Sequence, residues 1–326
     1  MRWHPAELIA ADFETPSART LTLRVPDWPG HLPGQHLDVR LTAPDGYHAE
    51  RSYSLAAPAD GDLVQITIQR VPEGEVSTYL VDTFPLGASI EIRGPIGGWF
   101  VWNPDTSGPA VLIAGGSGIV PLAAMLRARR KSPNPTPFRL LYSLRDPAAL
   151  YYRDELIPTR ALTATHRGEQ EGAPQAAESR GDELTPRPPA AGVSGGQGAE
   201  GGAAQVAGSR GNVSMRSELR TVAGVGSDGQ RWGGGVVGGH SDWLPGRDDG
   251  VEVFLAYTRS VPPGELRDAG RLTAEEIARY ALPPSGDVTC YVCGPTGFVE
   301  FAAAALVSAG HDPAMIRTER FGPTGK

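Results

Sequence analysis

Cysteine is scarce in this sequence, because the 326-residue chain has only two, Cys290 and Cys293. Two thiols are too few for a disulfide framework, a four-cysteine zinc site or a cysteine-ligated iron–sulfur cluster. Any redox cofactor is therefore expected to be organic or bound through other ligands, and we predict no metal site.

An excess of basic residues and a long apolar run are also missing. The chain has 30 Lys and Arg residues against 37 Asp and Glu residues, a formal net charge of −7. This balance lacks the positive field of a general nucleic-acid binder. No run of 18 apolar residues occurs, and the N-terminus lacks a secretory apolar segment. We therefore expect a cytoplasmic protein with no membrane span and no nucleic-acid partner.

Residues 162–249 differ in composition from the rest of the chain. Stretches such as GVSGGQGAEGGAAQVAG are rich in glycine and have few large apolar residues. Such a segment buries too little surface to offset the entropy lost on ordering. We predict a disordered, low-complexity insertion at 162–249, and its removal leaves a length that suits two domains.

The first hundred residues contain short β-branched runs separated by Pro and Gly. They are ARTLTLRV, QHLDVRLTA, RSYSLAAP, LVQITIQRV and SIEIRGP. Short strands with frequent turns are typical of an antiparallel barrel or sandwich. We predict an antiparallel β-barrel domain over residues 1–105.

After Pro109, buried strands alternate with helices. The predicted strands are AVLIAGG, FRLLYSL, VEVFLAY, VTCYVCG and MIRTERF, and the predicted helices are PLAAMLRARR, AALYYRDELI, TAEEIARYAL and FVEFAAAALVSAG. This alternation predicts an α/β doubly wound domain with a parallel five-stranded sheet, built from 106–161 and 250–326. Such sheets bind ligands beyond the carboxyl ends of their strands. The segments AGGSG, YSLRD, AYTR and VCGPT should therefore meet at one crevice.

The first of these segments is a glycine-rich run between a strand and a helix. Small residues let backbone N–H groups approach a phosphate at the N-terminus of the helix. The run predicts a pyrophosphate cradle, with a plain glycine-rich turn as the alternative; its members are Gly115, Gly116, Ser117, Gly118 and Ile119.

Arginines and hydroxyl groups follow the next two strands. Ser143 and Arg145 end one strand, Thr258 and Arg259 end the other, and Arg153 lies one helix further on. A guanidinium supplies the planar, charged fork that a 2′-phosphate needs. Each arginine taken singly is an ordinary solvated side chain, but together they favour a phosphorylated ribose. Arg271 is a weaker candidate.

The two cysteines lie in one predicted strand, three residues apart. Side chains at i and i+3 of a strand point to opposite faces, so a redox disulfide is a poor interpretation. We expect Cys290 in the core and Cys293 at the crevice, followed there by Gly294 and Pro295.

A polar strand in the first half offers a second binding surface. Arg51 and Tyr53 alternate with Ser52 and Ser54. An arginine beside an exposed tyrosine suits a phosphate joined to a flat ring. The alternative is a barrel strand with polar groups facing solvent.

Taken together and in this order, the motifs resemble the ferredoxin–NADP reductase superfamily. The similarity covers nearly all of the chain outside the insertion. It rests on LPGQH (32–36), RSYSL (51–55), EGEVSTYL (73–80), RGPIGGWF (93–100), IAGGSGIVPL (113–122), LLYSLRD (140–146), YYRDEL (151–156), YTR (257–259), GRL (270–272), YVCGPTGF (291–298) and ERFG (319–322).

The resemblance implies a flavin-binding barrel and a nicotinamide-binding parallel domain. Arg51 would bind a flavin phosphate, Tyr53 would pack on the isoalloxazine, and Ser54, followed by Leu55, would hydrogen-bond near flavin N5. The diphosphate of FAD would be held by Gly74, Val76, Ser77 and Thr78. Cys293 and Gly294 would flank the nicotinamide, with Glu319 near them and Phe321 in the place of a flavin-stacking aromatic residue. Gln69 and Arg70 stand where family members often carry a lysine.

The implied function is that of a flavoprotein reductase. Electrons would pass from NADPH, or from NADH, through FAD to a separate protein acceptor such as a ferredoxin. A stand-alone flavin or quinone reductase and a non-catalytic flavin-binding scaffold are the alternatives. The basic residues Arg127, Arg129, Arg130 and Lys131 are a candidate docking surface for an acidic ferredoxin, although cations at the end of a helix also complement its dipole.

Overall fold

The computed structural model describes residues 2–105, 107–133, 136–157 and 249–321. Of the insertion predicted at 162–249, only Asp249 belongs to the described residues. None of the described helices has the length and apolar character needed to cross a membrane.

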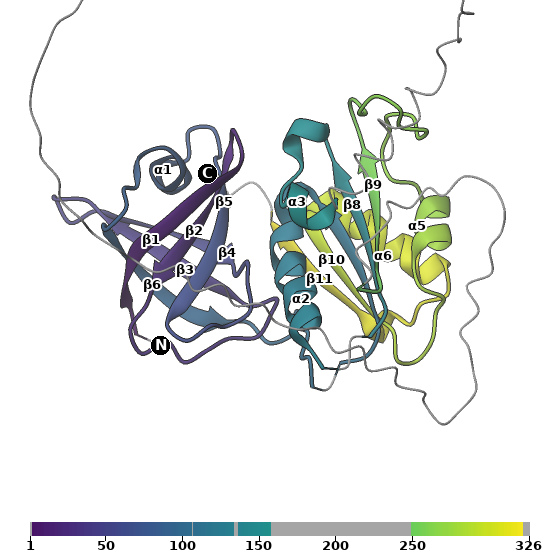
Figure 1. The fold of residues 1–326 in the computed structure, drawn as a ribbon, viewed down its shortest axis with the longest axis horizontal. Helices are drawn as coiled ribbons and strands as arrows, with labels where there is room; N and C mark the ends of the chain where they lie inside the picture. The colour runs from purple at the N-terminus through teal and green to yellow at the C-terminus, as the bar shows by residue number, and fades with distance from the viewer. Residues whose placement is uncertain (1, 106, 134–135, 158–248, 322–326) are drawn as a thin grey trace, which may run out of the picture. The chain divides into compact units, whose positions relative to one another are not determined.

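The N-terminal domain is the predicted antiparallel barrel (Figure 1). Its six strands pair in the order β4-β3-β6-β1-β2-β5. Their bounds are β1 (His4–Thr15), β2 (Ala18–Arg24), β3 (His36–Thr42), β4 (His48–Ser54), β5 (Leu63–Gln69) and β6 (Ser89–Ile96). A helical segment, α1 (Glu75–Thr78) continued by the π-helical turn η1 (Tyr79–Thr83), connects β5 to β6.

Strand β1 is absent from the five strands that the sequence predicts. It pairs with both β2 and β6, and its register against β2 shifts between Leu8 and Ala10 and again between Phe13 and Thr15. These irregularities interrupt the alternation of buried and exposed side chains. A search for strict period-two alternation therefore misses β1.

Strands β4 and β5 form the two edges of the six-stranded order. They meet through a bridge between Leu55 and Ile66 and through a hydrogen bond of 2.8 Å from Ala56 N to the Gln65 carbonyl. The barrel closes at this seam. Beyond the seam, the edge of β4 that carries Arg51 to Ser54 has no partner strand among the described residues.

The second domain is the predicted parallel sheet, with strands in the order β11-β10-β7-β8-β9. The strands are β7 (Ala110–Gly115), β8 (Phe138–Leu144), β9 (Val251–Tyr257), β10 (Thr289–Pro295) and β11 (Ile316–Phe321). The helical segments are η2 (Gly116–Gly118), α2 (Ile119–Lys131), η3 (Pro147–Ala149), α3 (Arg153–Leu156), α5 (Ala274–Tyr280), α6 (Thr296–Ser308) and η4 (Pro313–Met315).

Helices cover both faces of this sheet, with α2 on one and α5 and α6 on the other (Figure 1). Alternate residues of β10 enter opposite cores, because Tyr291 and Cys293 pack toward α2 whereas Cys290 and Val292 pack toward α6. The two free thiols therefore lie on opposite faces, as the strand period requires.

The helix predicted for AALYYRDELI is wrong, because the chain breaks there into η3 and the single turn α3. Tyr152, at the N-terminus of α3, has left-handed backbone angles, φ 54° and ψ 39°. A bulky side chain in this region costs about 1–2 kcal/mol, so surrounding contacts must hold it.

Those contacts come from the barrel and from α2. The Tyr152 N–H donates to Glu14 Oε2 at 2.9 Å, and Arg127 lies over its ring at 4.6 Å. Its hydroxyl is 2.6 Å from Thr67 Oγ1, which is 2.8 Å from Thr20 Oγ1, and Thr20 donates to Glu14 Oε1 at 2.6 Å. Since each hydroxyl has one hydrogen, the chain runs one way, from Tyr152 to Glu14.

The end of α2 makes a second set of internal contacts. Arg129, with 2% of its surface exposed, donates to the carbonyls of Thr136 and Asp249. Arg130 pairs with Asp249 at 2.8 Å and with Glu155 at 2.7 Å, and Arg127 pairs with Glu155 at 2.8 Å. These arginines therefore serve the fold and are not free to form the docking surface that we considered.

We expect Arg129→Met to destabilise the protein by about 3 kcal/mol, because the buried guanidinium loses its hydrogen bonds to two carbonyl groups. Lys131→Met, on the exposed end of the same helix, is the control and should change stability by less than about 0.5 kcal/mol. Urea unfolding measures both values. Equal effects in the two variants would contradict a structural role for Arg129.

Candidate functional site

A cavity of about 490 Å³ lies at the carboxyl edge of the parallel sheet. Residues from the ends of all five strands line it, so the four loops singled out in the sequence do converge. The turn between β1 and β2 and the end of β5 complete its wall. The lining includes Thr15, Pro16, Ser17, Gln69, Gly115, Gly116, Ser117, Ser143, Arg145, Asp146, Tyr151, Thr258, Pro295, Phe298 and Phe321.

The glycines of the glycine-rich run are needed for different reasons. A methyl group at Gly118 would collide with the Cys293 carbonyl, and one at Gly115 would lie 2.7 Å from the Phe298 ring. Gly116 instead has a left-handed φ of 56° and open space where a side chain would stand. It therefore leaves room for a phosphate directly before α2, a helix of 13 residues. Ile119, the first residue of α2, is fully buried and packs in the core of the domain.

Two of the predicted ribose-phosphate residues, Arg145 and Thr258, line the cavity together with Ser143. Backbone hydrogen bonds of 2.8 Å, from Thr258 N to the Leu144 carbonyl and from Arg259 N to the Arg145 carbonyl, hold the two strand ends together. Arg145 and Arg259 are exposed, and neither has an acidic partner within the described residues.

Arg259 and the other two arginines lie outside the cavity lining. Arg153 donates to the Pro147 carbonyl at 2.6 Å, and the carbonyl of Arg271 accepts from Arg267 at 3.0 Å. Asp146 lines the cavity beside Arg145 and was not singled out by the sequence. Its Oδ1 accepts from the N–H groups of Ala148 and Ala149, so it caps the turn η3.

Beneath the cavity, Cys293 and Glu319 occupy neighbouring positions of β10 and β11. The prediction that Cys293 lies at the crevice is wrong for its side chain, which is fully buried in the core and outside the cavity lining. Burial, together with the nearby Glu319 carboxylate, raises the pKa of Cys293. Glu319 Oε2 is buried without a hydrogen-bond partner among the described residues, and burial raises the pKa of Glu319 to about 7. Glu319 can therefore hold a proton near neutral pH, whereas Cys293 remains a neutral thiol.

The predicted flavin-contacting residues lie along the edge strand β4. Arg51 is exposed, and its guanidinium contacts only the neighbouring Glu50 carbonyl, at 2.7 Å, within the described structure. Ser52 donates to Asp38 on the opposite face. Tyr53 packs partly against the barrel core, and burial raises its pKa, so its hydroxyl stays protonated. Ser54 pairs with His36, and Leu55 is buried at the seam.

The predicted diphosphate residues surround the start of α1. Gly74 precedes the helix, and Thr78 is exposed. Val76 is buried in the barrel core, and Ser77 Oγ accepts from Val71 N at 3.1 Å, so both side chains support the loop. A phosphate here would meet backbone N–H groups and the Thr78 hydroxyl. Arg70, at the end of β5, pairs with Asp82.

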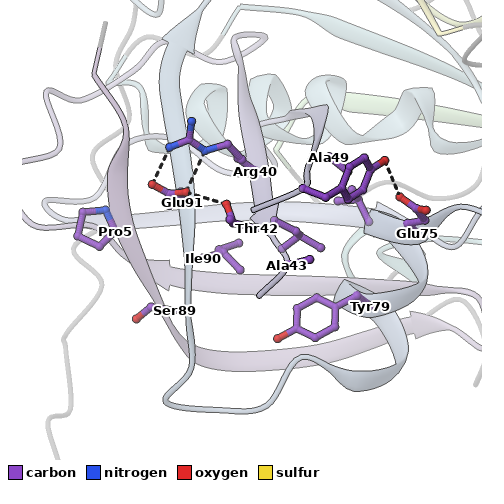
Figure 2. Close-up of a pocket in the computed structure, with 13 residues that line it drawn as sticks. Pro5, Arg40, Thr42, Ala43, Ala49, Glu75, Tyr79, Ser89, Ile90 and Glu91 are labelled. Carbon is purple, nitrogen blue, oxygen red and sulfur yellow. Dashed lines mark hydrogen bonds and ion pairs between the residues drawn. The ribbon is translucent and has the colours of Figure 1, made fainter. Parts of the chain in front are cut away.

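A larger cavity, about 660 Å³, opens on the barrel (Figure 2). At one side Arg40 and Glu91 form a bidentate ion pair, and at the other Tyr47 donates to Glu75 at 3.2 Å. Val76 is the only predicted site residue in its lining. The motif EGEVSTYL (73–80) contains three of the lining residues, Glu75, Val76 and Tyr79, but the sequence did not indicate a cavity there.

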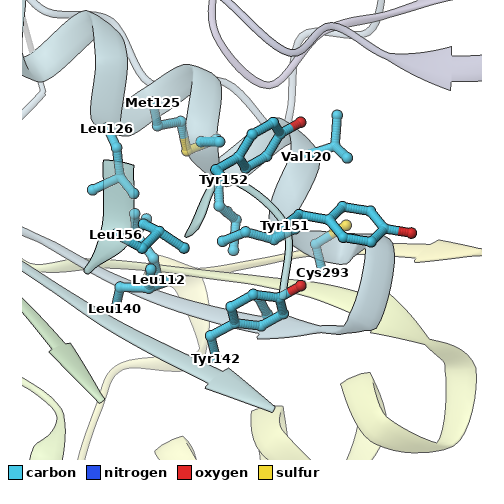
Figure 3. Close-up of a cluster of buried hydrophobic side chains, with 14 of the residues drawn as sticks. Leu112, Val120, Met125, Leu126, Leu140, Tyr142, Tyr151, Tyr152, Leu156 and Cys293 are labelled. Carbon is cyan, nitrogen blue, oxygen red and sulfur yellow. The ribbon is translucent and has the colours of Figure 1, made fainter. Parts of the chain in front are cut away.

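Tyr151 is a further cavity residue to which the sequence assigned no role. Its ring belongs to the cluster packed against α2, together with Tyr142, Tyr152 and Cys293 (Figure 3). The motif YYRDEL contains it, but two adjacent tyrosines give no sign of which one faces the cavity.

Two family models match the chain. An "oxidoreductase FAD-binding domain" matches residues 5–101, and an "oxidoreductase NAD-binding domain" matches residues 112–180. The chain belongs to the ferredoxin–NADP reductase superfamily. Its barrel is an FAD-binding domain, and its parallel sheet is an NAD-binding domain.

Curated relatives of this reductase-family chain include methane monooxygenase component C of Methylosinus trichosporium, 34% identical over 126 residues. The ferredoxin–NAD(P)+ reductase component of naphthalene 1,2-dioxygenase/salicylate 5-hydroxylase systems from Ralstonia is 30% identical over 159 residues. The matches cover 38% of this chain and 36% of the first relative, and 47% of both in the second case. The chain thus spans less than half the length of these relatives.

A solved structure confirms the two-domain fold. The flavohem-like FAD/NAD-binding domain of nitric oxide dioxygenase from Vibrio cholerae matches with a TM-score of 0.62 at 19% identity. The match covers 98% of this chain and 99% of that one.

The raised pKa of Glu319 predicts a stability change with pH. A carboxyl group whose pKa is higher in the folded than in the unfolded protein makes stability fall as the pH rises from about 4.5 to about 7. Over this range the unfolded protein loses the proton readily, whereas burial opposes its loss from the folded protein. We expect the stability of Glu319→Gln relative to wild type to be higher at pH 8 than at pH 5, by up to about 3 kcal/mol, because glutamine does not ionise. Urea unfolding at the two pH values tests this, and a pH-independent difference would contradict it.

Proposed function

We propose that this chain is an NAD(P)H-dependent flavoprotein reductase that passes electrons through FAD to a separate acceptor protein such as a ferredoxin. The carrying observation is the shared cavity, because the glycine-rich loop of the NAD-binding domain and residues of the FAD-binding barrel line the same space. A nicotinamide dinucleotide held by that loop would therefore lie against the barrel.

When bound, FAD supplies the redox chemistry, accepting a hydride from the reduced nicotinamide and releasing electrons one at a time. The protein's own residues provide binding and orientation. Arg51, which has no acidic partner among the described residues, would bind a flavin phosphate, with Gly74 and Thr78 holding the diphosphate. Tyr53 would pack on the flavin ring, and Ser54 would donate a hydrogen bond near N5.

The nucleotide side uses the opposite wall. Gly115 to Ser117 would hold the pyrophosphate. Pro295 and Phe321 would lie beside the nicotinamide, near Cys293 and Gly294. Glu319 would hold or release a proton there, because its pKa of about 7 matches a neutral medium. Its role is proton balance rather than nucleophilic attack.

Curated relatives with similar sequences are named as reductase components of oxygenase systems, which supports a protein acceptor of that kind for this chain. An anaerobic titration of the FAD-loaded protein with NADPH and with NADH tests the function. We expect the flavin absorbance to bleach, and adding an oxidised ferredoxin should restore it. Bound flavin that neither nucleotide reduces would favour the non-catalytic scaffold, and restoration only by free flavins or quinones would favour the stand-alone reductase.

A preference for NADPH follows from the unpaired arginines at the strand ends. We expect Arg145→Ala and Arg259→Ala each to raise the dissociation constant for NADP+ about tenfold or more, because a charge-assisted hydrogen bond to the 2′-phosphate is lost. The dissociation constant for NAD+ should change less than about threefold and is the internal control. Equal changes for both nucleotides, measured by calorimetry, would remove the 2′-phosphate assignment.

A further inference from the structure

Tyr151 differs from the other tyrosines of its cluster in how its hydroxyl is placed. The residue is 4% exposed, so its ring is almost entirely enclosed by the core packed against α2. It nevertheless lines the cavity that contains Gly115, Gly116 and Ser117. Figure 3 shows its hydroxyl pointing away from the rings of Tyr142 and Tyr152.

The Tyr151 hydroxyl has no hydrogen-bond partner in the part of the chain that the structure describes. It is also absent from the enclosed, unpartnered atoms of that part, which are Trp102 Nε1, Tyr142 Oη and Glu319 Oε2. The hydroxyl is therefore open to the cavity. A rigid ring with a free donor at its tip is suited to contact a polar ligand at little entropic cost.

The neighbouring residue explains why Tyr151 is held in this way. Tyr152 sits in the left-handed region and is fixed by Glu14, Thr67 and Arg127. The two tyrosine rings stand at 87° to each other, with their centroids 6.3 Å apart. One ring is thereby anchored to the barrel while the other is directed to the cavity. Strained backbone of this kind is frequently retained at functional sites.

We propose that Tyr151 binds the nicotinamide dinucleotide, its hydroxyl donating a hydrogen bond to an oxygen of the ribose–pyrophosphate backbone, and that Tyr152 is the positioning residue that sets it. This inference rests on the proposed function. The acceptor belongs to the part of the ligand that NADP(H) and NAD(H) share. The contribution of Tyr151 is therefore independent of the 2′-phosphate, unlike that of Arg145.

Tyr151→Phe removes the hydroxyl and keeps the buried ring. We expect the dissociation constants of NADP+ and NAD+, measured by calorimetry on the FAD-loaded protein, to rise by the same factor, about five- to tenfold. The flavin content and the thermal unfolding midpoint should not change. In turnover, KM for the reduced nucleotide should rise while kcat stays within about twofold.

Tyr142→Phe is the control for indirect effects through the cluster, because the enclosed Tyr142 hydroxyl faces the Tyr151 backbone and lies outside the cavity lining. Its nucleotide affinities should equal those of the wild type. Tyr152→Phe should weaken binding of both nucleotides through Tyr151, so it should add little to the loss already caused by Tyr151→Phe.

The outcomes separate this inference from the proposed function. Wild-type affinities in Tyr151→Phe, with flavin bound and reducible, would overturn the assignment of Tyr151 and leave the reductase standing. Additive effects of the two substitutions would overturn the positioning role of Tyr152. A wild-type protein that binds neither nucleotide would overturn both the inference and the reductase.

Discussion

A one-way chain of hydrogen bonds, from the Tyr152 hydroxyl through Thr67 and Thr20 to the Glu14 carboxylate, ties the parallel sheet to the barrel. Its members are buried, apart from the partly exposed Glu14, and every hydroxyl hydrogen in it is used. A buried network of this kind is favourable only when each member is satisfied, so it holds Tyr152 of the parallel domain against Thr67 of the barrel. The cavity at the strand ends depends on this contact, because its walls come from both domains.

The cavity also combines two electrostatic environments. Exposed guanidinium groups, such as that of Arg145, stand at the strand ends, whereas the Cys293 side chain and the Oε2 atom of Glu319 are buried. Burial favours the neutral form of an acid, and solvent favours the charged form of an arginine. One sheet edge can therefore hold a charged phosphate group at its rim and a neutral ring deeper in. This change from a buried to an exposed environment follows the order of residues along each strand, because residues within a strand lie in the core and those just after its end lie at the surface.

The sequence predicted the features that depend on periodicity and on the order of elements. Five parallel strands, the convergence of their loops and the opposite faces of Cys290 and Cys293 all follow from strand alternation. Strand β1 was missed because bulges interrupt its alternation, and the helix around Tyr152 was wrong because a long-range contact with Glu14 overrides local helix propensity. The place of Tyr151 in the cavity lining was equally hidden, since two adjacent tyrosines do not show which of them faces the cavity.

The arginines show most clearly what a sequence leaves open. The cluster at the end of α2 and the pair at the strand ends are equally basic in sequence, but the first meets Glu155 and Asp249, whereas Arg145 and Arg259 meet no acid among the described residues. An arginine that already has a partly buried carboxylate partner would have to break that ion pair to bind an external anion. An exposed arginine without an acidic partner has only to release bound water when it binds an anion. The difference in partners, not the number of charges, separates the arginines of the strand ends, which are available to an external anion, from those at the end of α2, which belong to the framework.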